Sequence, residues 1–305
     1  MFKNFLSWPV ISWPVKVSKR IVLPGFDGLP VYNVTRFFAK GLWENDITSR
    51  AASISFNLFL AIFPSLIVLF TVIPFIPIAN FQQSLLELIH DLVPKSTYET
   101  IRATVEDIVT RPRGGLLSLG FFLALYFATT GIHSMMEAIN ITLQSMETRS
   151  WIMQRLVSIL IVIIISILLI ISIGLMTFGT SLLSVILPEH LLNSPFYVSF
   201  IWFLKWLVIL MTFFFTISFV YYLAPAKKRH FRFISAGSTL ATILFIITTL
   251  GFNFYVDNFA RYNILYGSIG TLMIVLLWIY FNAFSLLIGF ELNASIRKAK
   301  LGGEM

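Results

Sequence analysis

The sequence contains no cysteine and very little charge. Its 305 residues include 22 Lys and Arg with 14 Asp and Glu, so that charged residues make up 12%, about half the share of an average soluble domain. Without cysteine, disulfides, iron–sulfur clusters and thiolate zinc sites are excluded. A water-soluble chain of this length could not cover its surface with so few charges, and we therefore exclude an ordinary soluble fold.

Recognisable catalytic and metal-binding motifs are also missing. The chain has no Walker loop, zincin motif or nucleophile elbow, and its four histidines show no metal-ligand spacing. The run from Gly267 to Gly270 does not match a phosphate-binding loop, and we expect these two glycines to form a tight entry into the last span, with Gly267, Gly270 and Gly289 as structural or kink positions. The sequence predicts no cofactor and no bound metal. Residues 1–20 carry two prolines and lack the apolar core of a signal peptide.

What the chain has in abundance is apolar residues, 57% of the total, gathered in long blocks. Several blocks reach the ~20 residues that cross a bilayer as a helix, and lipid forces such segments to satisfy their backbone internally. The sequence therefore predicts an all-α, polytopic membrane protein with six transmembrane helices. The predicted spans are roughly 49–77, 116–140, 153–187, 197–223, 233–256 and 268–295. Pro64 predicts a kink in the first of them.

The distribution of positive charge predicts the orientation. Sixteen of the 22 Lys and Arg residues lie on one side of the predicted membrane and five on the other, while Lys205 falls inside a span. The side rich in Lys and Arg is normally cytoplasmic. We therefore expect both termini in the cytoplasm and a location in the bacterial inner membrane.

Two segments outside the spans are amphipathic. In the first outer loop, residues 79–115, two apolar stripes and a capping box from Ser96 to Glu99 predict a helical hairpin. Residues 1–45 form a basic N-terminal segment in which 31–42 show helical spacing. This helix could lie on the inner leaflet or be a linker packed on the bundle. Residues 46–296 then form the membrane domain, and 297–305 a basic cytoplasmic tail.

Polar side chains fall on three helical faces within the predicted spans. The faces are Asp46, Arg50, Ser53 and Asn57; then Tyr126, Thr130, His133, Glu137 and Asn140; and then Trp278, Asn282, Ser285, Gly289 and Asn293, with Glu291 close by. Most of these residues are expected in the inner half of the bilayer, where ionisable groups are costly. They could converge on a polar cavity open to the cytoplasm.

Two interpretations of these faces remain open. In the functional one they form a substrate site in which Arg50 binds an anion and Glu137 or Glu291 holds Arg50 in place. In the structural one, small polar side chains join helices while charges near helix ends reach water. His133 and Glu137, four residues apart, could alternatively hold a metal.

A further set of charges lies toward the outer side. Lys205 is about two turns inside the fourth span, and Asp257 and Arg261 stand at the outer surface. Lys205 could pair with Asp257 or extend its ammonium to the interface.

Three stretches of the sequence resemble the YihY/virulence factor BrkB family, once labelled ribonuclease BN. They are Asp46 with 50–53 and 63–64; Tyr222 with Pro225; and 254–255, 266–270, 277–280 and 289–294. Phe290 stands where a small residue is more usual in the family. The resemblance covers about residues 42–296 and implies a six-helix inner-membrane protein. A nuclease activity is not expected, because the chain has no carboxylate cluster for metals on a soluble face.

Three functions from different classes are compatible with these features. The first is a transporter or translocase of a lipid or amphipathic anion, which uses the polar faces and has membrane lipids as its partners. The second is a scaffold that recruits an envelope protein through the outer hairpin, and the third is an intramembrane enzyme using His133 and Glu137. We favour the first, expect the protein not to be an enzyme, and expect no nucleic-acid partner.

Overall fold

The computed structural model describes residues 17–76, 82–83, 86–87, 95–143, 147–186, 195–226, 232–258 and 261–302. Nearly all of these residues are helical, and the extended pairing found in the described part is an isolated bridge between Val22 and Pro30. The chain divides into two compact units, one made of 1–55 with 132–305 and one of 56–131.

The described helices confirm the all-α prediction, and six of them are long and apolar enough to cross a membrane. The six candidate spans are Ile47–Phe75, Gly114–Thr142, Trp151–Thr177, Ser199–Leu223, Ala236–Val256 and Leu272–Leu301. The elements are α2 (Val31–Glu44), α3 (Ile47–Val72), η2 (Ile73–Phe75), α5 (Lys95–Thr110), α6 (Gly114–Thr142), α7 (Trp151–Ile186), α9 (Pro195–Leu223), α10 (Ala236–Asn258) and α11 (Arg261–Gly302). The six predicted spans each overlap one of these candidates.

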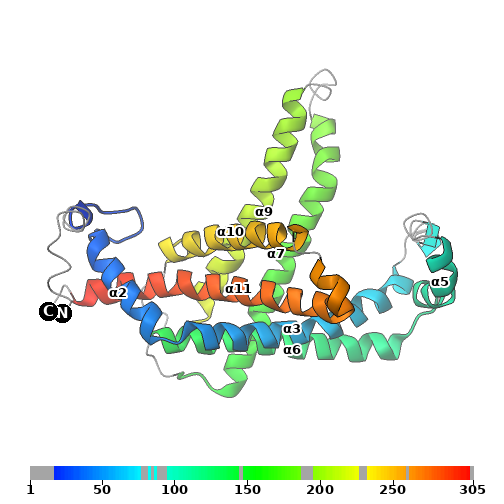
Figure 1. The fold of residues 1–305 in the computed structure, drawn as a ribbon, viewed down its shortest axis with the longest axis horizontal. Coiled ribbons are helices and arrows are strands. Elements are labelled where there is room, and N and C mark those ends of the chain that lie inside the picture. The colour runs from blue at the N-terminus through cyan, green and yellow to red at the C-terminus, as the bar shows by residue number, and fades with distance from the viewer. Residues whose placement is uncertain are drawn as a thin grey trace. The chain divides into compact units, whose positions relative to one another are not determined.

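Within the first unit, α10 runs alongside α11, α7 pairs with α9, and α2 lies against α11 (Figure 1). Two glycines explain how closely α10 and α11 approach. A Cβ on Gly237 would lie 2.2 Å from the Gly289 carbonyl oxygen, and one on Gly289 would lie 2.5 Å from the Gly237 carbonyl oxygen. Small residues at such crossings let helix backbones touch, which is how membrane helices pack.

The start of α10 is capped by serines at its own N-terminus and by a side chain of α11. Ser235 and Ser238 exchange hydrogen bonds, the hydroxyl of each accepting from the other's backbone N–H at 3.1 Å. Asn293 of α11 accepts a hydrogen bond from the Gly237 backbone N–H at 2.8 Å and donates to the Ser235 hydroxyl at 2.9 Å. The otherwise unsatisfied donors of the first helical turn are therefore used.

Phe290, where the family resemblance predicts a small residue, is fully buried. Its ring meets the ring of Tyr221 edge to face at 5.2 Å, and the Tyr221 hydroxyl donates to the Leu286 carbonyl oxygen. Tyr221 on α9 therefore packs directly against Phe290 on α11.

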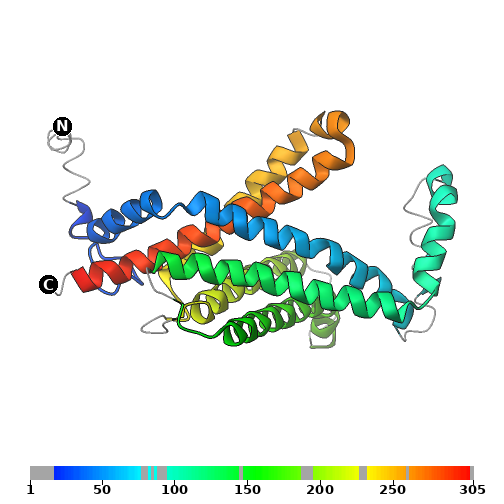
Figure 2. The same cartoon turned by 90° about the horizontal axis from the view of Figure 1, so that it is seen from below.

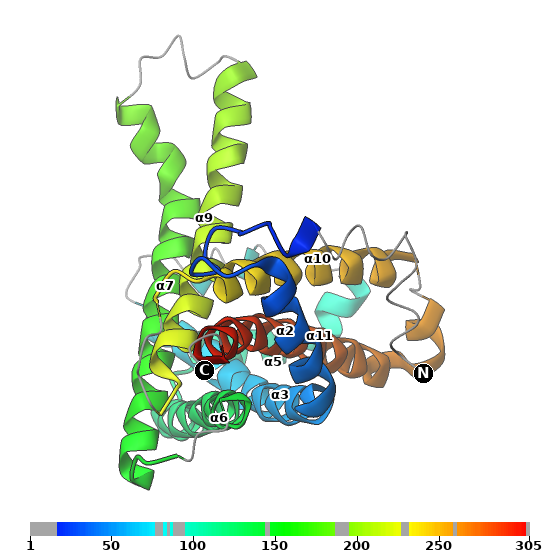
Figure 3. The same ribbon diagram turned by 90° about the vertical axis from the view of Figure 1, so that its left-hand side faces the viewer.

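Helix α2 is the predicted amphipathic N-terminal helix, and its apolar face packs on α11 (Figure 3). Val34 is completely buried in a cluster with Phe26, Leu292, Ile296 and Ala299. The polar face points outward, with a Lys40–Glu44 ion pair. This geometry agrees with the interpretation of residues 31–42 as a segment packed on the bundle.

The last helix begins before the predicted span. Helix α11 starts at Arg261, so Gly267 and Gly270 lie inside the helix, ahead of the candidate span that begins at Leu272. In Figure 2 the first turns of α11, drawn in orange, bend away from the rest of the helix.

The second unit contains the end of α3, η2, α5 and the start of α6. Helix α3 continues through Pro64 to Val72, and a Cβ on Gly131 of α6 would lie 2.5 Å from Leu58. Helix α5 begins at Lys95, close to the predicted second arm of the outer hairpin, and packs against η2. Most of the predicted first arm, around residues 81–92, lies outside the described residues.

Candidate functional site

The Arg50 guanidinium forms hydrogen bonds with the end of α6 and with the connection between α2 and α3. Its guanidinium donates to the Ala138 carbonyl oxygen at 2.7 Å, to the Thr142 hydroxyl at 2.8 Å and to the carbonyl oxygen of Asn45. Its Nε–H also donates to the Asp46 carbonyl oxygen at 3.4 Å. Four of the five guanidinium N–H donors are therefore used by the protein, which leaves little capacity for an anionic substrate.

Glu291 lies behind Asn45, without direct contact to Arg50. The Asn45 side chain donates to Glu291 Oε2 at 2.9 Å, while the Asn45 carbonyl accepts from Arg50. The other carboxylate oxygen, Oε1, is buried and finds no hydrogen-bond partner among the described residues. It points at Gly41 of α2, where an added Cβ would lie 1.8 Å away. Glu291 therefore joins α11 to the α2–α3 connection.

Replacing Gly41 by Ala should separate α2 from α11. The new methyl group would overlap both Oε1 and Cδ of the buried Glu291 side chain, and overpacking of this kind costs about 1–3 kcal/mol. We expect a lower apparent unfolding temperature in detergent. Gly251→Ala, where nothing lies within 4 Å of the new methyl, is the control. In a Glu291→Ala background Gly41→Ala should have little effect, and an equal loss in both backgrounds would contradict the contact.

Asp46 caps the start of α3. Its carboxylate accepts hydrogen bonds from the Thr48 hydroxyl at 3.1 Å and the Ser49 backbone N–H at 3.4 Å. These bonds with Ser49 and Thr48 lower the pKa of the exposed Asp46 carboxyl. The first predicted polar face therefore serves helix capping and helix joining at Asp46 and Arg50.

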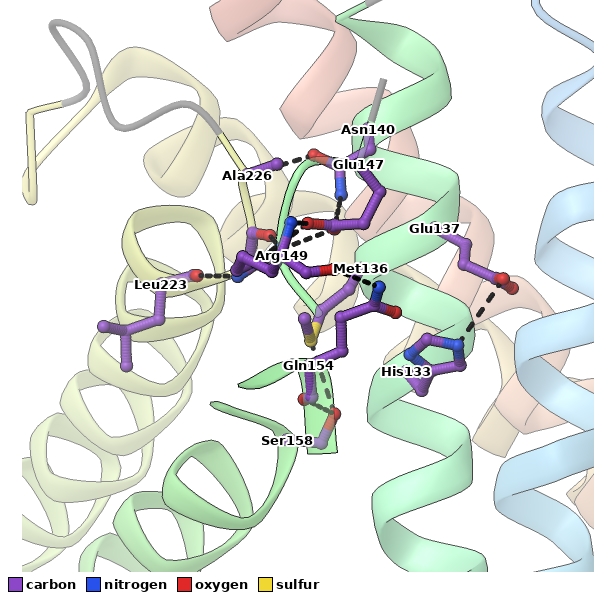
Figure 4. Close-up of polar contacts among 11 residues, drawn as sticks. His133, Met136, Glu137, Asn140, Glu147, Arg149, Gln154, Ser158, Leu223 and Ala226 are labelled. Atoms are coloured by element: carbon purple, nitrogen blue, oxygen red, sulfur yellow. Dashed lines mark hydrogen bonds and ion pairs between the residues drawn. The ribbon is translucent and has the colours of Figure 1, made fainter. Parts of the chain in front are cut away.

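A second polar cluster, which the sequence did not predict, closes the ends of α6 and α9 (Figure 4). Arg149 donates twice to Glu147, from Nε at 2.8 Å and from an Nη at 2.8 Å. It also donates to the carbonyl oxygens of Leu223 and Ala224 at the end of α9. A guanidinium at a helix C-terminus satisfies free carbonyls and opposes the helix dipole.

Asn140 belongs to this cluster and not to a substrate-facing surface. It is buried, donates to Glu147 Oε2 at 2.8 Å, and accepts a hydrogen bond from the Ala226 backbone N–H at 2.9 Å. The Gln154 side chain adds a bond to the Arg149 carbonyl at 2.9 Å. The cluster thus fastens the α6–α7 connection to the segment after α9.

Glu147 should make stability sensitive to acid. Hydrogen bonds from Arg149 hold the pKa of Glu147 below its ordinary value of 4.5, although partial burial opposes the shift. A carboxyl whose pKa is lowered by folding stabilises the folded state above 4.5, and this contribution disappears as pH falls through the folded-state pKa. The difference in unfolding temperature between wild type and Glu147→Gln should therefore be largest near neutral pH and shrink in acid. A difference that is constant with pH would contradict this assignment.

The third predicted face packs helices together. Asn282 donates to the Trp278 carbonyl of its own helix at 2.8 Å, and Ser285 lies 3.2 Å from the Thr248 hydroxyl of α10. Gly289 and Asn293 form the contacts with Gly237 described above. Ser285, Gly289 and Asn293 therefore contact α10, which favours the structural interpretation for these three residues. The buried Oδ1 of Asn282 has no hydrogen-bond partner among the described residues.

His133 and Glu137 differ from the buried polar residues of these clusters because Glu137 is exposed and His133 is partly exposed. His133 Nε2 lies 3.5 Å from Glu137 Oε1, and the two side chains are 29% and 65% exposed. Figure 4 shows both on a side of α6 away from the Glu147–Arg149 cluster. Glu137 does not hold Arg50, as one hypothesis had it; its described partner is His133.

The remaining predicted residues are placed as follows. In the second unit, Tyr126 is exposed, Thr130 donates to the Tyr126 carbonyl at 2.8 Å, and Asn57 is half-buried. In the first unit, Lys205 is exposed on α9. The side chains of Asp257 and Arg261 lie outside the described part of the structure. Among the described residues, no group of three or more His, Asp or Glu could hold a metal ion.

Glu147 and Arg149 are the main residues that the sequence reasoning overlooked. From the sequence, Arg149 was counted only as one of the positive charges expected on the inner side. A useful signal was present, because an acidic and a basic residue two positions apart interrupt a short connection between two apolar spans.

Six apolar helices joined through buried polar clusters define a multi-pass α-helical membrane protein. The chain belongs to the family described as Virulence factor BrkB, whose model matches residues 38–304. That family is not an established family of enzymes, and the ribonuclease name attached to some members is a historical label.

Several curated proteins are similar over most of their length. The ribonuclease-like protein YfkH of Bacillus subtilis is 29% identical over 252 residues, covering 83% of this chain and 90% of that protein. A UPF0761 membrane protein of Mannheimia succiniciproducens is 25% identical, covering 85% and 87%. Another from Vibrio parahaemolyticus is 26% identical, covering 86% and 81%. No solved structure matches the chain.

Proposed function

We propose that the protein is a lipid translocase whose substrate passes along the exposed flank of α6. The observation that carries the proposal is the pair formed by His133 and Glu137, which lies on an apolar span and whose side chains are 29% and 65% exposed. An ionisable group that faces hydrocarbon on a membrane helix costs at least about 2.5 kcal/mol. Such a pair is expected to face water or polar headgroups.

The depth of the pair supports contact with headgroups. Helix α6 has 29 residues and is therefore about 43 Å long, whereas the hydrocarbon core is about 30 Å thick. If the helix is centred, each end extends about 7 Å beyond the core. Glu137 lies five residues before Thr142, about 7 Å from the helix end, and so falls at the hydrocarbon boundary. His133 lies one turn deeper.

The remaining polar clusters support a lipid more than a small anion bound at Arg50. Arg50 already donates to two backbone carbonyls and a hydroxyl at distances of 2.7–3.4 Å, and it also donates to Asn45. Ser285 and Asn293 of the third face are occupied in joining α10 to α11. Among the polar clusters described above, the partly exposed His133–Glu137 pair on α6 therefore has the greatest capacity to bind a substrate.

The test is lipid movement in liposomes that contain the purified protein. Lipids labelled on the acyl chain should exchange between leaflets faster than in protein-free liposomes, and His133→Ala/Glu137→Ala should reduce the rate at least about tenfold if two polar contacts are lost. Glu44→Gln, an exposed carboxylate on α2, is the control. Equal rates with and without protein, over a range of headgroups, would refute the proposal.

A scaffold function has separate support from α5. This helix lies outside the six candidate spans and carries exposed ion pairs, Arg102–Glu106 and Arg111–Asp107. Deleting α5 should then abolish the cellular function, while the His133→Ala/Glu137→Ala variant keeps it. The opposite result would favour translocation.

A further inference from the structure

The charge of the exposed pair on α6 indicates which headgroup it could bind. Glu137 is the more exposed of the two side chains, at 65%, and an ionised carboxylate only accepts hydrogen bonds. The neighbouring cation, Arg50, is directed to the Ala138 and Asn45 carbonyls instead of to the open surface. The exposed Glu137 carboxylate can therefore accept hydrogen bonds from a positively charged donor.

We infer that the flank at His133 and Glu137 binds lipids whose headgroup carries a primary ammonium, an inference that rests on the proposed function. A primary ammonium has three N–H donors and forms short, charge-assisted bonds with a carboxylate. A quaternary ammonium has none, and its usual protein site is an aromatic cage, whereas this flank offers a carboxylate. A headgroup with phosphate as its only charge is repelled by Glu137.

The position of His133 adds a second contact along the path. It lies one helical turn deeper than Glu137, with 3.5 Å between Nε2 and Oε1, and an imidazole nitrogen can accept or donate a hydrogen bond. An ammonium group that leaves Glu137 toward the membrane centre therefore meets a second polar partner before it enters hydrocarbon. A stepwise pair of contacts lowers the cost of the first part of the crossing.

The experiment uses the full chain in phosphatidylcholine liposomes that contain one acyl-labelled probe at a time. The probes are phosphatidylethanolamine, its N-acetylated form, and phosphatidylglycerol, and leaflet exchange is followed by chemical quenching of the label. We expect phosphatidylethanolamine to move about tenfold faster than the other two, because a charge-assisted hydrogen bond is involved. Glu137→Gln should remove this preference, whereas Glu44→Gln should keep it. Elution as a single monodisperse species with an unchanged unfolding temperature shows that Glu137→Gln is folded.

The outcomes separate this inference from the proposed function. If all three probes move at the same raised rate, or if Glu137→Gln keeps the preference, the headgroup inference is wrong and translocation stands. If no probe moves faster than in protein-free liposomes, the proposed function itself fails. Protein-dependent uptake of free radiolabelled ethanolamine, without lipid movement, would assign the ammonium site to a soluble amine and overturn the lipid.

Discussion

Gly289→Ala is expected to disrupt the contact between α10 and α11. Its Cβ would lie 2.5 Å from the Gly237 carbonyl oxygen, 2.6 Å from the Ala241 Cβ and 2.7 Å from the Tyr221 hydroxyl. The carbonyl oxygen and the Cβ cannot rotate away, so α10 has to move away from α11. We expect a loss of about 3 kcal/mol, the upper end of the range for overpacking.

The measurement for Gly289→Ala is the apparent unfolding temperature in detergent, together with the amount of monodisperse protein recovered. Gly251→Ala on α10 is a matched control, because nothing lies within 4 Å of its new methyl and alanine is the better helix former by about 1 kcal/mol. The control should be neutral or slightly stabilised. If the two variants unfold together, the close approach of α10 and α11 is wrong.

Arg149→Ala should have the second largest effect. The change removes the donors to Leu223 and Ala224 at the end of α9 and leaves the Glu147 carboxylate without its cation. Removing one partner of a buried ion pair costs about 3–5 kcal/mol. Because Glu147 is 25% exposed, water can partly replace the guanidinium, and we expect the lower end of that range.

Two comparisons make the Arg149 result specific. Arg232→Ala removes the partner of Asp27, and the Arg232 side chain is 72% exposed, so the effect should be at most about 1 kcal/mol. Arg149→Lys keeps the charge but loses the planar fork, and should fall between Arg149→Ala and wild type. Equal unfolding temperatures for Arg149→Ala and Arg232→Ala would show that the cluster does not support the fold.

The six spans could be predicted because each depends on its own composition. A block of about 20 apolar residues must become a helix in lipid, whatever its neighbours are. Helix α11 begins at Arg261, before the predicted span, because the helix continues beyond the apolar block through Gly267 and Gly270. Glycine in a helix costs only about 1 kcal/mol relative to Ala, which an otherwise helical segment tolerates.

The partners of the polar residues could not be predicted in the same way. Helical spacing predicts Asn140 and His133 on one face of α6, but the connection after α6 folds back and brings Glu147 to Asn140 and not to His133 (Figure 4). Likewise, Asn45 lies between Arg50 and Glu291 because α2 packs on α11. Contacts of this kind depend on how helices are rotated against each other, and one sequence does not encode that in any local pattern.

The caps that α11 provides have a consequence for the order of synthesis. The Gly237 backbone N–H is satisfied by Asn293, 56 residues later, and the Asn45 side chain by Glu291, 246 residues later. While the chain emerges from the ribosome, the beginning of α10 and the α2–α3 connection therefore lack these hydrogen-bond partners until the last helix has been synthesised. A nascent chain that stops before Glu291 contains five of the six spans yet lacks the residues that fasten its earliest helix. The last helix, α11, therefore completes the packing of helices that are synthesised before it.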